Sequence, residues 1–117
     1  MRILSLDPIE HKIPSAEESS TLALSPKEHF EDLNKFFFAT VASDYFPKDE
    51  RWYSKKEINE EEKKKVLKEL MKSSEEIGKE VTEGLNPTVI LYDDWDEIDF
   101  LFETEARFGR FHWITTA

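Results

Sequence analysis

Apolar residues recur at helical spacing in the segment that follows Ser25. The stripe comprises Phe30, Leu33, Phe36, Phe37, Phe38, Val41 and Tyr45, which is typical of one face of a helix. A start signal precedes it, because Ser25 can cap a helix, Pro26 suits the first turn and Glu28 completes a capping box. The pattern predicts a helix that begins at Ser25 and is broken within residues 44–51. So many aromatic side chains on one helix indicate that other elements cover it.

A second helical pattern begins at Ser54 or Asn59. Ser54 opens another capping box, and Asn59 precedes glutamates that would lie in a first turn, where the helix dipole favours acidic side chains. The apolar stripe that follows comprises Val66, Leu67, Leu70, Met71, Ile77 and Val81. Gly84 and Pro87 end the pattern. It predicts an amphipathic helix whose lysine-rich outer face is solvated.

From Thr88 the apolar period changes to two, which predicts strands. Residues 88–92 form a β-prone run expected in the centre of a sheet, and residues 93–96 contain turn formers. Residues 97–104 then alternate. The predicted core face carries Ile98, Phe100, Phe102 and Thr104, and the other face carries Glu97, Asp99, Leu101 and Glu103. A second turn at 105–109 and a third alternating run at 110–116 complete an antiparallel meander.

The first 24 residues are predicted to be loosely organised. Ile3, Leu4 and Leu6 can form a short strand, and the run PSAEESST at residues 14–21 has the composition of a loop. The whole pattern predicts a single α+β domain over residues 1–117, with two helices packed on one face of a small antiparallel sheet. Three C-terminal strands form that sheet, and a fourth from the N-terminus is left open.

The distribution of charge restricts the kind of partner. The net charge is −10, and residues 88–117, with two basic and seven acidic residues, contribute −5 of it, whereas residues 51–87 contain nine of each. A concentrated negative field repels nucleic acid and anionic membranes and attracts basic proteins. Direct binding to nucleic acid or membrane is therefore not expected. The absence of Cys excludes disulfides, and with no signal-peptide pattern it predicts a cytoplasmic protein.

No motif in the sequence identifies a reaction. The chain has three glycines and no glycine-rich phosphate loop, and its three histidines are scattered. The acidic run from Asp93 lacks the glycine and the twelfth-position glutamate of a calcium loop. Paired carboxylates can act in glycoside hydrolysis, but any cluster of seven acids supplies such pairs by chance. We therefore expect a protein that is not an enzyme and that uses no metal or other cofactor.

The stretch LYDDWDEIDFLFETE, residues 91–105, places seven carboxylates around aromatic side chains and contains no basic residue. One interpretation is a hairpin whose acids discourage aggregation. However, a solvated face ordinarily mixes both charges, and Tyr and Trp often anchor interfaces. We therefore interpret it as a binding surface for a basic protein. The predicted contact residues are Tyr92, Asp93, Asp94, Trp95, Asp96, Glu97, Asp99, Glu103 and Glu105, with the turn at 93–96 as the best single candidate.

The leading hypothesis is an immunity or antitoxin-type protein that neutralises a basic partner, such as a nuclease toxin. A carboxylate surface can occupy a site that is built for phosphates, and long-range attraction speeds association. A first alternative is a DNA mimic that inhibits restriction or CRISPR machinery. A second is a small adaptor or regulatory subunit, whose sign would be a large exposed apolar patch. The sequence does not determine the oligomeric state.

Overall fold

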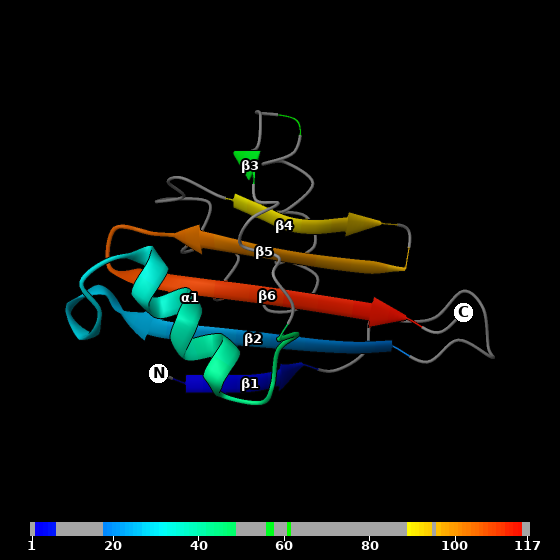
Figure 1. Cartoon of the computed structure of the whole chain (residues 1–117), viewed down its shortest axis with the longest axis horizontal. Helices are drawn as coiled ribbons and strands as arrows, with labels where there is room; N and C mark the ends of the chain where they lie inside the picture. Colours follow the sequence, from blue (N-terminus) through cyan, green and yellow to red (C-terminus); the bar gives the residue numbers. More distant parts are fainter. Residues whose placement is uncertain are drawn as a thin grey trace.

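The computed structural model describes residues 2–6, 18–48, 56–57, 61, 89–94 and 96–115. Its elements in chain order are β1 (Arg2–Leu6), β2 (Glu18–Pro26), the 3-10 helix η1 (Lys27–His29), α1 (Leu33–Ala42), β3 (Lys56–Glu57), β4 (Val89–Asp94), β5 (Glu97–Glu103) and β6 (Arg107–Thr115). The strands form one antiparallel sheet, and α1 lies on one face of it, across β6 and β5 (Figure 1). The predicted α+β class is therefore confirmed.

The sheet has six strands among the described residues, in the order β1-β2-β6-β5-β4-β3. The predicted C-terminal meander is confirmed, because β4 pairs with β5 and β5 with β6, both antiparallel. The predicted short strand near the N-terminus is also present, as β1. Strand β4 lies between β5 and β3 in the sheet order, and among the described residues β3 covers its outer side at Val89 and Ile90.

Strand β2 is the main element that the sequence pattern missed. It pairs with β6 over its whole length, from Glu18 opposite Thr115 to Pro26 opposite Arg107, and with β1 on its other side. Its four consecutive residues Leu22–Ser25 are all buried, so both faces of this strand are covered and no alternation marks it. Polar residues of the kind found in loops begin the strand. In the described part of residues 1–24, residues 2–6 form β1 and residues 18–24 belong to β2.

Helix α1 begins later than predicted. Asp32 is its N-cap, and its carboxylate accepts a hydrogen bond from the Lys35 backbone N–H at 2.9 Å. Ser25, the predicted cap, is instead buried in β2, where its hydroxyl donates to the Pro26 carbonyl at 3.1 Å. The helix ends at Ala42, just before Asp44, whose φ of 68° ends helical geometry.

The second predicted helix lies outside the described residues except for Glu61, and α1 is the one α-helix that the described residues contain. A helix start at Ser54 is wrong, because Lys56 and Glu57 form β3 and pair with Ile90 and Val89. A start at Asn59 lies outside the described residues and stays a prediction. No helix in the described part of the chain is long and apolar enough to cross a membrane.

Buried side chains lie on both faces of the sheet. Under α1 lies a cluster formed by Ala23, Phe36, Phe37, Phe46, Val89, Leu91, Leu101 and Phe108. Phe100 and Phe102 are one residue out of phase with Leu101, so they point to the opposite face, where the Phe100 ring lies 6.2 Å from that of Phe102 and 5.2 Å from that of Phe111. The alternation in β5 was predicted correctly, but the assignment of Asp99 and Leu101 to a solvated face was wrong. Both are fully buried.

Candidate partner-binding site

The β4–β5 hairpin carries the centre of the predicted surface. Asp94 ends β4 and pairs with Glu97, the first residue of β5, across the turn. The Thr115 backbone N–H donates to the Asp96 carbonyl at 2.9 Å, which ties the turn to β6. Tyr92 is 39% exposed and Asp94 is exposed. Because they are two residues apart on one strand, Tyr92 and Asp94 lie on the same face.

Asp99 is not available to a partner. Both oxygens of its carboxylate accept hydrogen bonds from Arg110, from Nε at 2.9 Å and from Nη2 at 2.7 Å, and both side chains are fully buried. Arg110 Nη1 also donates to Thr40 Oγ1 on α1 at 2.8 Å. The guanidinium carbon lies 5.0 Å from the Phe37 ring centroid and 4.7 Å from that of Phe46. This acidic residue therefore joins the sheet to the helix.

Glu97 also has an internal contact. Its Oε2 lies 2.7 Å from His112 Nε2 on β6, and the two side chains are 14% and 12% exposed. Asp99 is the direct cross-strand neighbour of His112, so the histidine lies beside two carboxylates on one face of the sheet. The negative charge of residues 97–99 is thus largely directed at groups within the protein.

Glu103 and Glu105 lie at the opposite end of β5, beside the tight turn to β6, which is closed by the Thr104 N–H donating to the Arg107 carbonyl at 2.9 Å. At about 3.4 Å per residue, β5 separates Glu103 from Glu97 by about 20 Å. Figure 1 shows these two ends at opposite sides of the sheet. The predicted surface therefore divides in two.

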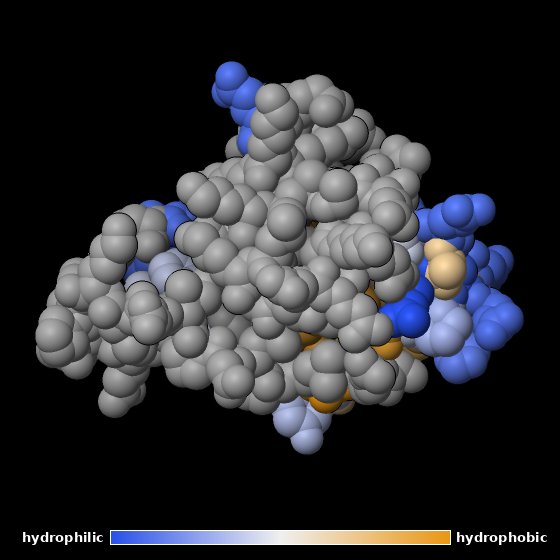
Figure 2. All heavy atoms as spheres, turned by 180° about the vertical axis from the view of Figure 1, so that it is seen from behind, coloured by the Kyte–Doolittle hydropathy of each residue, from blue (hydrophilic) through white to orange (hydrophobic). Residues whose placement is uncertain are grey.

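The structure brings together Tyr92, Asp94, Asp96 and Glu97 at the hairpin end. Asp93 lies in β4 and pairs with Ile98, and Trp95 falls outside the described residues. Seen from behind the sheet, hydrophilic side chains gather at the other end, where η1 and the β5–β6 turn lie (Figure 2). Exposed acidic residues there are Glu28, Glu31, Asp32 and Glu105.

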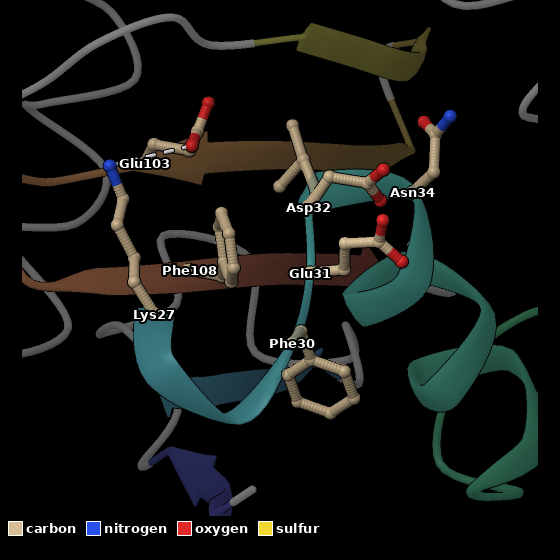
Figure 3. Close-up of a pocket in the computed structure, with 8 residues that line it drawn as sticks. Lys27, Phe30, Glu31, Asp32, Asn34, Glu103 and Phe108 are labelled. Atoms are coloured by element: carbon tan, nitrogen blue, oxygen red, sulfur yellow. Dashed lines mark ion pairs between the residues drawn. The ribbon is translucent and has the colours of Figure 1, made fainter.

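That second end contains an open groove of about 480 Å³. Figure 3 shows its lining, which comes from η1, the start of α1, β5 and β6. The lining residues are Lys27, Phe30, Glu31, Asp32, Leu33, Asn34, Glu103 and Phe108. The Lys27 backbone N–H donates to the Ala106 carbonyl at 2.9 Å, which holds η1 against the β5–β6 turn. Sequence reasoning missed this site, because its two halves are distant in the chain and no spacing signal links them.

The chemistry of both ends suits recognition of cations. Among the described residues, no group of three or more His, Asp or Glu side chains could hold a metal ion. Comparisons of the chain with protein-family models, with curated proteins and with solved structures find no match. Assignment of a function therefore depends on the residues themselves.

Proposed function

We propose that the protein is a non-catalytic acidic inhibitor that binds and neutralises a basic partner protein, with a nuclease toxin as the leading class. The observation that carries the proposal is the exposed Tyr92 beside the exposed Asp94 at the end of the β4–β5 hairpin. No basic residue occurs between residues 88 and 106. An aromatic anchor among carboxylates is the composition expected where a protein meets Lys and Arg side chains.

In this proposal the acidic side chains speed association with the partner, and the apolar area of Tyr92 slows dissociation. Asp94 and Asp96 lie at the tip, where their field extends into solvent and accelerates encounter with a cationic surface. Tyr92 then contributes buried area and a phenolic hydroxyl to the complex, which lowers the dissociation rate. The paired acids Glu97 and Asp99 serve the fold and contribute little to steering.

The decisive experiment is affinity capture with the intact chain, followed by mass spectrometry of the bound proteins. We expect a basic protein, and the association rate measured with it should fall steeply between low and high salt. The double variant Asp94→Asn/Asp96→Asn should slow association, whereas Asp44→Asn/Glu61→Gln, which neutralises two exposed acidic groups outside the hairpin and the groove lining, should not. Equal rates for both variants, or a partner that is not basic, would contradict the proposal.

A second candidate function, an adaptor or regulatory subunit, is favoured by a different observation. Phe38, on α1, is 57% exposed, and Tyr45, in the segment after the helix, is 65% exposed. Large exposed aromatic residues often mark protein interfaces. In this case the captured partner would have no excess of basic residues, and Phe38→Ser/Tyr45→Ser would abolish capture while Asp94→Asn/Asp96→Asn would not.

A further inference from the structure

Two aromatic rings, Phe30 and Phe108, line the groove at the η1 end, and a third ring behind them holds them in place. The Phe30 ring meets the Phe36 ring edge-on, with centroids 5.7 Å apart, and the Phe36 ring stacks on Phe108 at 5.8 Å. Phe36 is fully buried and Phe108 nearly so. The buried Phe36 ring is not part of the lining, but it fixes the positions of the two rings that are, so Phe30 and the small exposed part of Phe108 form a preformed surface.

The rim of the groove is acidic. Glu31, Asp32 and Glu103 contribute three carboxylates, against the single ammonium of Lys27. In Figure 3, Glu31 and Asp32 lie on one side of the Phe108 ring and Glu103 and Lys27 on the other. An anionic ligand such as a phosphate would be repelled by this arrangement, and a cationic ligand would be attracted.

Lys27 shows how a cation is held there. Its Nζ lies 5.7 Å from the centroid of the Phe108 ring and 3.5 Å from Glu103 Oε1. The Lys27 side chain is 37% exposed and that of Glu103 is 19% exposed. A partly exposed ion pair of this kind is weak, so a better cation can compete for Glu103 and the ring face. The groove thus already contains a cation from its own chain at the site where an external one would bind.

We propose that the groove binds an arginine side chain of a basic protein partner, which displaces the Lys27 ammonium. A guanidinium is planar, so it can stack on an aromatic ring while its N–H groups donate to carboxylates in a fork, which an ammonium cannot do. A volume of about 480 Å³ accommodates such a side chain together with neighbouring backbone. The inference rests on the proposed function for the basic character of the partner, but it assigns a separate surface about 20 Å from the hairpin end.

The test uses the full chain and hexa-arginine as the probe, with hexa-lysine and hexa-glutamate for comparison, followed by isothermal titration calorimetry. We expect hexa-arginine to bind more tightly than hexa-lysine, and hexa-glutamate not to bind. Glu31→Gln/Glu103→Gln should weaken hexa-arginine binding by about tenfold, as the loss of charge-assisted hydrogen bonds implies. Lys27→Met should strengthen it by roughly twofold to fivefold, the range expected from the loss of a competing exposed ion pair.

The matched control is Asp94→Asn/Asp96→Asn, which removes the same charge at the hairpin end and should leave peptide affinity within about twofold, since distant sites act independently. Three results would each contradict arginine binding in the groove. They are equal weakening by both double variants, no preference for arginine over lysine, and weaker binding by Lys27→Met. If the captured protein responds to the hairpin variant while the peptide ignores the groove variants, the groove inference fails and the proposed function stands. If the peptide responds to the groove variants while the captured protein ignores the hairpin variant, hairpin steering is contradicted and the groove inference stands.

Discussion

Arg110 joins the sheet to α1 through a single guanidinium group. It donates to both oxygens of Asp99 and to Thr40, and it lies over the rings of Phe37 and Phe46. The free energy of unfolding depends on such a pair mainly when one partner is removed, because a buried charge without its partner is strongly destabilising. The Asp99–Arg110 pair therefore specifies how the helix sits on the sheet.

Replacing Arg110 by Met should lower the free energy of unfolding by about 3–5 kcal/mol, because it leaves the Asp99 carboxylate buried and uncompensated. The double variant Asp99→Leu/Arg110→Met should recover much of that loss, since it removes both charges. Arg110→Lys should fall nearer the single variant, because an ammonium cannot donate to both oxygens in a fork. Urea denaturation of the variants measures these differences. A double variant no more stable than Arg110→Met would contradict the account.

Gly109 leaves room for the ring of Phe102, its partner on the neighbouring strand. It pairs with Phe102, and a Cβ at Gly109 would lie 2.0 Å from Phe102 Cζ. Gly109→Ala should therefore destabilise the fold by about 1–3 kcal/mol, the usual range for overpacking. Phe102→Leu/Gly109→Ala should lose less than the two single variants do in sum, because leucine vacates the position of the ring. Thermal unfolding of the four proteins forms the required cycle, and simple additivity would show that the ring is not the cause.

At the scale of elements, the Asp32 cap is the clearest local interaction that fixes where α1 begins. Asp32→Ala should lower stability by about 1 kcal/mol, because it removes the acceptor for the Lys35 N–H. Glu31→Ala, at the neighbouring exposed acid, should change stability by less than about 0.5 kcal/mol. Thermal or urea unfolding measures both. If the two variants proved equally destabilising, general charge at the helix start would explain the effect, and capping would not.

Local sequence pattern was sufficient to predict those elements that neighbouring residues determine. The alternation in residues 97–104 and the turn formers at 93–96 predicted the β4–β5 hairpin, because side-chain period and turn chemistry depend on neighbouring residues. The same reasoning failed for β2, where burial of both faces removes the alternation. It also misplaced the helix start, since a capping signature at Ser25 lies inside a strand that pairs with β6. Long-range pairing overrode a local preference there.

For the candidate site too, local pattern predicted only the features that depend on neighbouring residues. Exposure of Tyr92 and Asp94 followed from the turn, but the roles of the other acids depended on strand register. Asp99 was assigned to solvent because nothing local shows that β6 places Arg110 diagonally across from it. The groove depends on η1 meeting the β5–β6 turn, a contact between segments distant in the chain. Charge counted along a sequence therefore overestimates the charge that a partner meets.

For the whole molecule, this means that the acidic surplus of residues 88–117 acts at two ends rather than on one surface. Two carboxylates, those of Asp99 and Glu97, are directed inward, toward Arg110 and His112. Exposed acids remain at the hairpin tip and around the groove, about 20 Å apart along β5. A partner that contacts both must present cations at a matching separation, which is more selective than attraction to a uniform negative field.

Two separate contact regions predict additive losses of affinity. With the captured partner, Asp94→Asn/Asp96→Asn and Glu31→Gln/Glu103→Gln should each weaken binding, and the quadruple variant should lose the sum of the two free energies, because sites farther apart than about 10 Å rarely couple. The hairpin pair should act mainly on the association rate and the groove pair mainly on the dissociation rate. Surface plasmon resonance at fixed ionic strength separates the two rates. If one double variant bound as weakly as the quadruple variant and the other bound like the unchanged protein, the partner would contact one end of the sheet alone, and the variant with the effect would identify that end.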